Sequence, residues 1–125
     1  MKNYIYMLLI AIQSMAMSSQ TLIDSPLFGG SIDDQFGWAV AISGDGSRFV
    51  ASAQGFNNSA GQIKMYSINN NTIQQIGTSI SGTGPNDLFG TSVAISADGN
   101  RVASGAIGSS NFTGRVTVYE LVNGT

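Results

Sequence analysis

The chain contains no cysteine and no histidine, and only 10% of its 125 residues are charged. Without these two residue types it has no disulfide, no thiol nucleophile, no zinc site of the usual kind and no Ser-His-Asp triad. Five Lys and Arg stand against seven Asp and Glu, so the clustered positive charge that nucleic-acid binding requires is also missing. These absences predict a protein that is not an enzyme, with no catalytic residue, metal site or cofactor, and that does not bind nucleic acid.

Glycine, by contrast, is abundant with 16 residues, and the sequence repeats itself. The stretch 34–68 returns without a gap 53 positions later as 87–121. A period of about 50 residues is typical of stacked copies of one supersecondary unit. We therefore divide the chain into a lead-in segment (20–33), a first repeat (34–86) and a second, incomplete repeat (87–125). The shared positions include Phe36-Gly37, Val40-Ala41-Ile42-Ser43, Asp45-Gly46 and Tyr66, which reappear as Phe89-Gly90, Val93-Ala94-Ile95-Ser96, Asp98-Gly99 and Tyr119.

Residues 1–19 have the three-part form of a secretory signal peptide. Lys2 supplies the basic start, 4–12 form an apolar run, and small residues follow at Ser14, Ala16 and Ser18. An uncleaved anchor or a buried first strand is the alternative, but the apolar run is short for a membrane span. We predict a secreted or cell-surface protein with no membrane span in the mature chain, which begins between Met17 and Ser19.

Four Asn-x-Ser/Thr sequons fit that extracellular location. They begin at Asn57, Asn70, Asn111 and Asn123 and fall in expected loops, so the chain is a candidate glycoprotein. A chain this rich in Asn, Ser and Thr contains about two such sequons by chance, so their support is modest.

Each repeat is expected to form short antiparallel strands. The first, 36–43 and 89–96, is small or apolar at nearly every position, which predicts a central strand buried on both faces. An Asp-Gly turn leads to the second strand, 48–53 and 101–106, which ends in a Gly-bounded loop, 55–61 and 108–114.

The third strand, 62–68 and 115–121, alternates, with Gln62, Lys64 and Tyr66 on an expected wetter face. A fourth strand is expected at 72–80, and burial is expected to fall from the first strand to the last. This pattern predicts an all-β fold in which each repeat is a four-stranded blade of a β-propeller.

At this point the sequence resembles a known family. Phe36-Gly37 followed by Ser52-Ala53-Gln54, and Phe89-Gly90 followed by Gly105-Ala106-Ile107, are similar to the FG-GAP repeat of integrin-alpha-type propellers. The family's Gly-Ala-Pro signature is degraded in both copies, although its spacing is intact. WD repeats have a shorter period and carry Gly-His and Trp-Asp pairs that this chain lacks. The resemblance implies a non-catalytic extracellular interaction or cell-adhesion module that binds a protein or a glycan.

Integrin-type blades often carry an Asp-x-Asp-x-Asp-Gly calcium loop at the first hairpin. The matching positions here read Ala41, Ser43 and Asp45, and Ala94, Ser96 and Asp98 in the second repeat. Calcium prefers six to eight oxygen ligands, several of them charged. One carboxylate per loop is too few, so Asp45 and Asp98 are interpreted as turn formers.

Two blades cannot close a ring, so further blades in the same chain or self-association of short subunits must cover their faces. We interpret Trp38 as packing between blades. The alternative function is a lectin-like propeller assembled from two-blade subunits, with sugars stacked on Phe56, Phe112 or Tyr66. An enzyme is a weaker hypothesis, because its carboxylate pair would have to be Asp33-Asp34, which we expect in a solvated loop.

Overall fold

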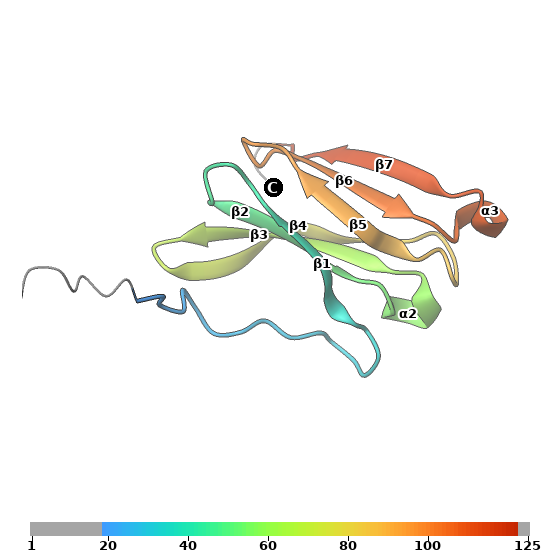
Figure 1. Cartoon of the computed structure of the whole chain (residues 1–125), viewed down its shortest axis with the longest axis horizontal. Helices are drawn as coiled ribbons and strands as arrows, with labels where there is room; N and C mark the ends of the chain where they lie inside the picture. The colour runs from blue at the N-terminus through green and yellow to red at the C-terminus, as the bar shows by residue number, and fades with distance from the viewer. Residues whose placement is uncertain (1–18, 123–125) are drawn as a thin grey trace, which may run out of the picture.

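The computed structural model describes residues 19–122, and its strands form two antiparallel sheets (Figure 1). The all-β prediction is thereby confirmed, and the predicted strand ends lie within one residue of the observed ones. Residues 1–18 of the predicted signal peptide (1–19) and the sequon at 123 fall outside the described residues. The first sheet contains, in spatial order, β1 (Phe36–Ile42), β2 (Arg48–Ala53), β3 (Gln62–Asn69) and β4 (Thr72–Ser81); the second contains β5 (Phe89–Ile95), β6 (Arg101–Ala106) and β7 (Arg115–Glu120).

The recurring Phe-Gly pair marks a bulge at the start of each repeat. The register of β1 against β2 shifts between Phe36 and Val40, and that of β5 against β6 shifts between Phe89 and Ser92. Gly37 and Gly90 lie in this interval with φ of 91° and 88°. Residues with side chains rarely adopt such values, so the glycine allows the bulge that turns the first strand.

The hydrophobic core lies between the two sheets, which stack face to face (Figure 1). The first sheet contributes Val50, Ile63 and Met65, and the second contributes Phe89 and Val102. Each of these side chains is at most 5% exposed. Removing their apolar surface from water supplies the main force that holds the sheets together.

The prediction that the first strand is the most buried is wrong. No residue of β1 is fully buried, and Trp38, Val40 and Ile42 are 54%, 66% and 61% exposed. The reason is that the second sheet covers only one face of the first. The deepest strands are β2 and β3, which have a strand on each side.

The predicted wetter face of the third strand is also wrong. Gln62 and Tyr66 are each 8% exposed. Tyr66 stacks on Phe49 with ring centroids 4.9 Å apart, and the Gln62 amide donates a hydrogen bond to Ser81 Oγ. Both faces of β3 are therefore covered, one by the second sheet and one by aromatic packing.

Residues 21–27, which we call the N-terminal strap, run along the other face of the first sheet. Asp24 Oδ2 accepts a hydrogen bond of 2.8 Å from the backbone N–H of Ile73 in β4. A groove of about 520 Å³ remains between the strap and Phe36, Val40 and Phe49. Val40 of the sheet stays 66% exposed, so the strap covers this face only in part.

Candidate functional site

The connections at one end of the sheets provide the first candidate surface. They are the lead-in loop 29–35 and the short turns α2 (Phe56–Ser59) and α3 (Ser109–Phe112), which we call the loop end (Figure 1). Both turns contain consecutive left-handed residues, Asn57 to Ser59 and Ser110 to Phe112. Asn tolerates this conformation better than most residues, which explains its presence in both turns.

Each turn is fixed to the loop that precedes its own repeat. Gly55 N donates to Asp34 O and Gly108 N donates to Asp87 O, both at 3.1 Å. A Cβ atom at Gly55 would lie 1.9 Å from the carbonyl oxygen of Asp33, and one at Gly108 would lie 1.8 Å from that of Asn86. Only glycine permits this approach, so the Gly-bounded loops have a well-defined position.

Asp33 is exposed, as predicted for a solvated loop, but Asp34 is buried, which corrects that prediction for the second carboxylate of the pair. Its Oδ2 accepts hydrogen bonds from the backbone N–H groups of Gly30 and Ser31 at 3.1 and 2.8 Å. This carboxylate therefore closes the loop before the first strand.

Asp87 has the same role in the second repeat. Its Oδ2 accepts 2.8 Å hydrogen bonds from the backbone N–H and the hydroxyl of Thr83, and it pairs with Arg115 Nη2 at 3.0 Å. The hydrogen bonds from Thr83, with a smaller effect of the Arg115 charge, lower the pKa of Asp87 below its usual value. The ionised carboxylate therefore holds the loop closed.

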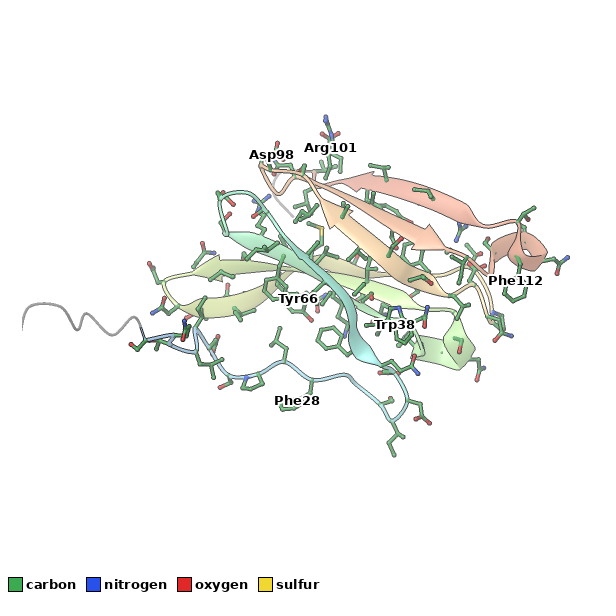
Figure 2. All side chains as sticks on the ribbon, viewed as in Figure 1. Phe28, Trp38, Tyr66, Asp98, Arg101 and Phe112 are labelled. Carbon is green, nitrogen blue, oxygen red and sulfur yellow. The ribbon has the colours of Figure 1, made fainter. Side chains whose placement is uncertain are left out.

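Phe112 presents its ring to solvent at the loop end. It is 73% exposed, whereas Phe56 is half-buried (Figure 2). A groove of about 610 Å³ lies between residues 31–35 and 55–59 and is lined mainly by polar groups. An exposed aromatic ring near polar loops can contact either a sugar or an apolar side chain of a protein ligand.

The other two aromatic residues singled out from the sequence are not at this end. Tyr66 is buried by Phe49 and cannot act as a stacking platform. Trp38 lies on the face of the first sheet turned away from the second, so it does not pack between the two described sheets.

The opposite, hairpin end is organised by Asp45 and Asp98. Asp45 Oδ1 accepts hydrogen bonds from Ser43 Oγ, Ser47 N and Ser47 Oγ at 2.7, 3.0 and 2.8 Å. Asp98 Oδ1 accepts from Ser96 Oγ and Asn100 N at 2.5 and 3.0 Å. Both carboxylates are engaged in their own turns, as the turn-former interpretation expects.

We expect the Asp45 carboxylate to make the stability of the fold depend on pH below about 4. Hydrogen bonds from Ser47 and Ser43 lower the pKa of Asp45 to about 2. A group with a lowered folded-state pKa stabilises the fold above its unfolded pKa and loses that contribution as pH falls through the folded value. Melting temperatures measured between pH 5 and 2 should fall less for Asp45→Asn than for the wild type. An identical pH dependence in the two proteins would contradict this assignment.

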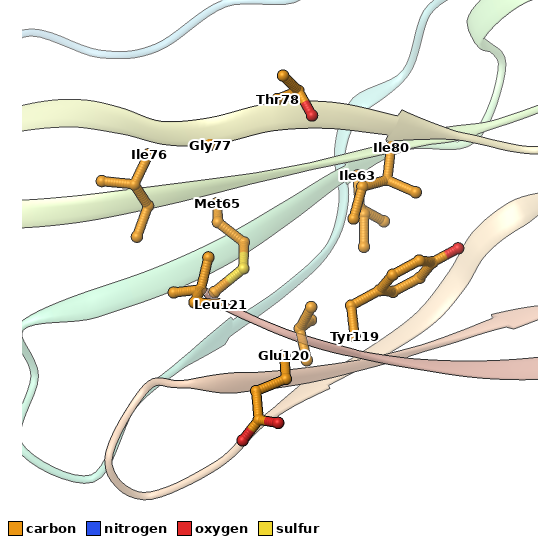
Figure 3. Close-up of a pocket in the computed structure, with 10 residues that line it drawn as sticks. Ile63, Met65, Ile76, Gly77, Thr78, Ile80, Tyr119, Glu120 and Leu121 are labelled. Carbon is orange, nitrogen blue, oxygen red and sulfur yellow. The ribbon is translucent and has the colours of Figure 1, made fainter. Parts of the chain in front are cut away.

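A small pocket between β4 and β7 is a packing defect rather than a ligand site. Its volume is about 170 Å³, and its walls include Met65, Ile76, Tyr119 and Leu121 (Figure 3). Glu120 is at its rim and is engaged with Arg101 at 3.0 Å. The volume is well below the 300–1,000 Å³ typical of small-molecule sites.

Three of the four sequons lie within the described residues. Asn57, Asn70 and Asn111 are exposed in turns, so each is accessible for glycosylation. Within 19–122, no three acidic residues come together in a group able to hold a metal ion. No helix in this part of the chain is long and apolar enough to cross a membrane.

Comparison with known proteins adds no relative to this picture. No protein-family model matches the chain, and no curated protein is significantly similar to it in sequence.

Proposed function

We propose that this chain is a non-catalytic extracellular interaction module built from β-propeller blades of the FG-GAP type. The observation that carries the proposal is the exposed Phe112 ring on a turn fixed by backbone hydrogen bonds at the loop end. Loops held by a rigid sheet scaffold are frequent binding surfaces. The Phe-Gly bulges and the stacking of two similar sheets support the blade architecture, and the apolar N-terminal segment supports secretion or display at the cell surface.

A lectin-like activity is the second candidate. It is favoured by the exposed ring of Phe112, since sugars stack on aromatic faces. The lectin hypothesis and the protein-binding hypothesis share this surface and differ in the ligand.

Binding to printed glycans and to immobilised collagen, laminin and fibronectin tests both candidates. We expect the labelled chain to bind at least one of these probes, and Phe112→Ala to weaken that binding about tenfold or more, because truncating an aromatic anchor commonly has such an effect. Glycan binding supports the lectin candidate, and binding to a protein probe supports the adhesion candidate.

Phe28→Ala is the matched control for this experiment. Phe28 is 83% exposed but lies in the lead-in segment, away from α3 (Figure 2). It should bind like the wild type. Absence of binding to every probe, or equal effects of the two substitutions, would refute the assignment of Phe112 as the contact.

A further inference from the structure

Each sheet leaves one apolar face without a sheet against it within the described part of the chain. The first-sheet outer face presents Trp38, Val40 and Ile42, all more than half exposed. The second-sheet outer face presents Val116 and Val118, which are 75% and 64% exposed. Such contiguous apolar surfaces are typical of interaction sites.

The joint between the two sheets shows what kind of surface each face fits. In that joint Ile63 and Met65 of β3 are 1% and 5% exposed. Val116 and Val118 occupy the same positions of the second repeat, 53 residues later. The second-sheet outer face is therefore an open copy of the surface that the first sheet uses to bind the second.

The complementary half of the joint is repeated as well. Phe89 and Val102 of the second sheet are each 1% exposed against the first sheet. Their counterparts, Phe36 and Phe49, lie on the first-sheet outer face. One chain thus carries both halves of the same contact, on opposite ends of its stack.

One pair of positions at which the two repeats differ links the two outer faces more specifically. Across the joint, Gln54 Nε2 donates to Thr91 Oγ1 at 2.8 Å. The matching positions on the outer faces hold Ile107 and Trp38, which are 51% and 54% exposed. A polar pair is replaced by an apolar pair with one member on each face, as expected if these two residues meet in a contact between chains.

The hairpin end repeats a polar contact of the joint. Arg48 Nη1 donates across the joint to Asn100 Oδ1 at 2.6 Å and to Gly99 O at 3.3 Å. The counterpart of Arg48 is Arg101, whose side chain is 65% exposed. The counterparts of its acceptors are Ser47 Oγ and Gly46 O, so a stacked chain offers Arg101 two oxygen acceptors.

At the loop end, the lead-in loop has the same backbone conformation as the segment that makes hydrogen bonds across the joint. At the joint, the N–H groups of Asn86 and Leu88 donate to the carbonyls of Asn58 and Ser59 at 3.0 and 2.9 Å. Asn86 and Leu88 have φ of 59° and 55°. Their counterparts on the lead-in loop, Asp33 and Gln35, adopt nearly the same values, 67° and 55°.

We propose that copies of this chain stack head to tail, with the second-sheet outer face of one copy packed on the first-sheet outer face of the next. The contact joins two different surfaces, so it leaves one free face at each end of a stack until a ring closes. The N-terminal strap occupies part of the first-sheet outer face and must move aside for the second copy. This inference goes beyond the proposed function, because it rests on the sheet faces and not on the ligand.

Sedimentation velocity of the secreted chain, from which the predicted signal peptide is removed, between about 1 and 100 µM tests the stacking, because weak protein contacts are populated in this range. The wild type should grow from the monomer to larger species. Ile42→Lys blocks one face and Val118→Lys the other, so each variant alone should stay monomeric. Gln74→Lys is the control, because Gln74 is exposed in β4 and is not among the residues assigned to the contact.

Mixing the two blocked variants separates stacking from aggregation. Each still carries one intact face, and the intact faces are complementary, so the mixture should form 1:1 dimers and nothing larger. A wild type that stays monomeric at every concentration overturns the proposal, and so does a mixture that forms no dimer.

Variants that recreate the polar pair of the internal joint distinguish loss of the contact from misfolding. Trp38→Thr and Ile107→Gln should each weaken association, and the double variant should restore it by recreating the pair found at the internal joint. Ligand binding is measured separately on the arrays, so failure of one proposal does not imply failure of the other.

Discussion

Phe89→Ala is expected to lower the free energy of unfolding by about 3–5 kcal/mol, because it leaves a cavity where the two sheets meet. The Phe89 side chain is 1% exposed and meets the Tyr119 ring edge-on, with centroids 6.3 Å apart. Urea unfolding at a fixed, low protein concentration, followed by the fluorescence of the single tryptophan, measures the loss.

The counterpart Phe36→Ala provides the control. Phe36 meets Tyr66 in the same edge-on geometry at 6.4 Å, but it is only half-buried because no sheet covers it. Its loss should be about half as large, since less apolar surface leaves contact with protein. Equal losses for the two variants would show that the outer face is covered in solution even at low concentration.

Gly61→Ala is the second substitution with a large expected effect. Gly61 has a φ of 82°, and a Cβ atom there would lie 2.0 Å from the carbonyl oxygen of Phe89. The left-handed conformation costs an alanine about 1–2 kcal/mol. Forcing the sheets apart should add about 1–3 kcal/mol.

Gly114→Ala measures the conformational cost alone, so the steric cost at Gly61 is obtained as the difference between the two variants. Gly114 has a φ of 81°, but its nearest neighbour to a new Cβ is 3.9 Å away. This variant should therefore show the conformational cost alone. Urea unfolding of both variants measures the two losses of stability. A Gly114 variant as unstable as the Gly61 variant would indicate that the close approach of Gly61 to Phe89 contributes little.

Strand positions were predictable because the signals for them are local. Asp-Gly at 45–46 and 98–99 places the hairpins, and the glycines at 55, 61, 108 and 114 bound the loops. The Asp-Gly pairs act within their own turns, through the positive φ of Gly46 and Gly99. The glycines at the loop ends mark where strands stop, although the close approach of Gly61 to Phe89 in the other sheet is visible only in the structure.

Burial was not predictable, because it depends on what lies against each face. Ile63 and Val116 occupy the same position of two repeats, yet one is 1% exposed and the other 75%. The same holds at the candidate site. The burial of Tyr66 depends on Phe49 from the adjacent strand, whereas the closing role of Asp34 was signalled by its recurrence as Asp87 after a second glycine-containing loop.

The bulge in β4 bears on how chains meet edge to edge. The register of β3 against β4 shifts between Ile63 and Met65, opposite Gly77, which has a φ of 66°. A bulged, strongly twisted outer strand is a poor template for an incoming β-strand. β7, the outer strand of the second sheet, begins at Arg115 and ends at Glu120, and charge there also discourages pairing. The irregular β4 therefore works against cross-β growth at this edge of the first sheet.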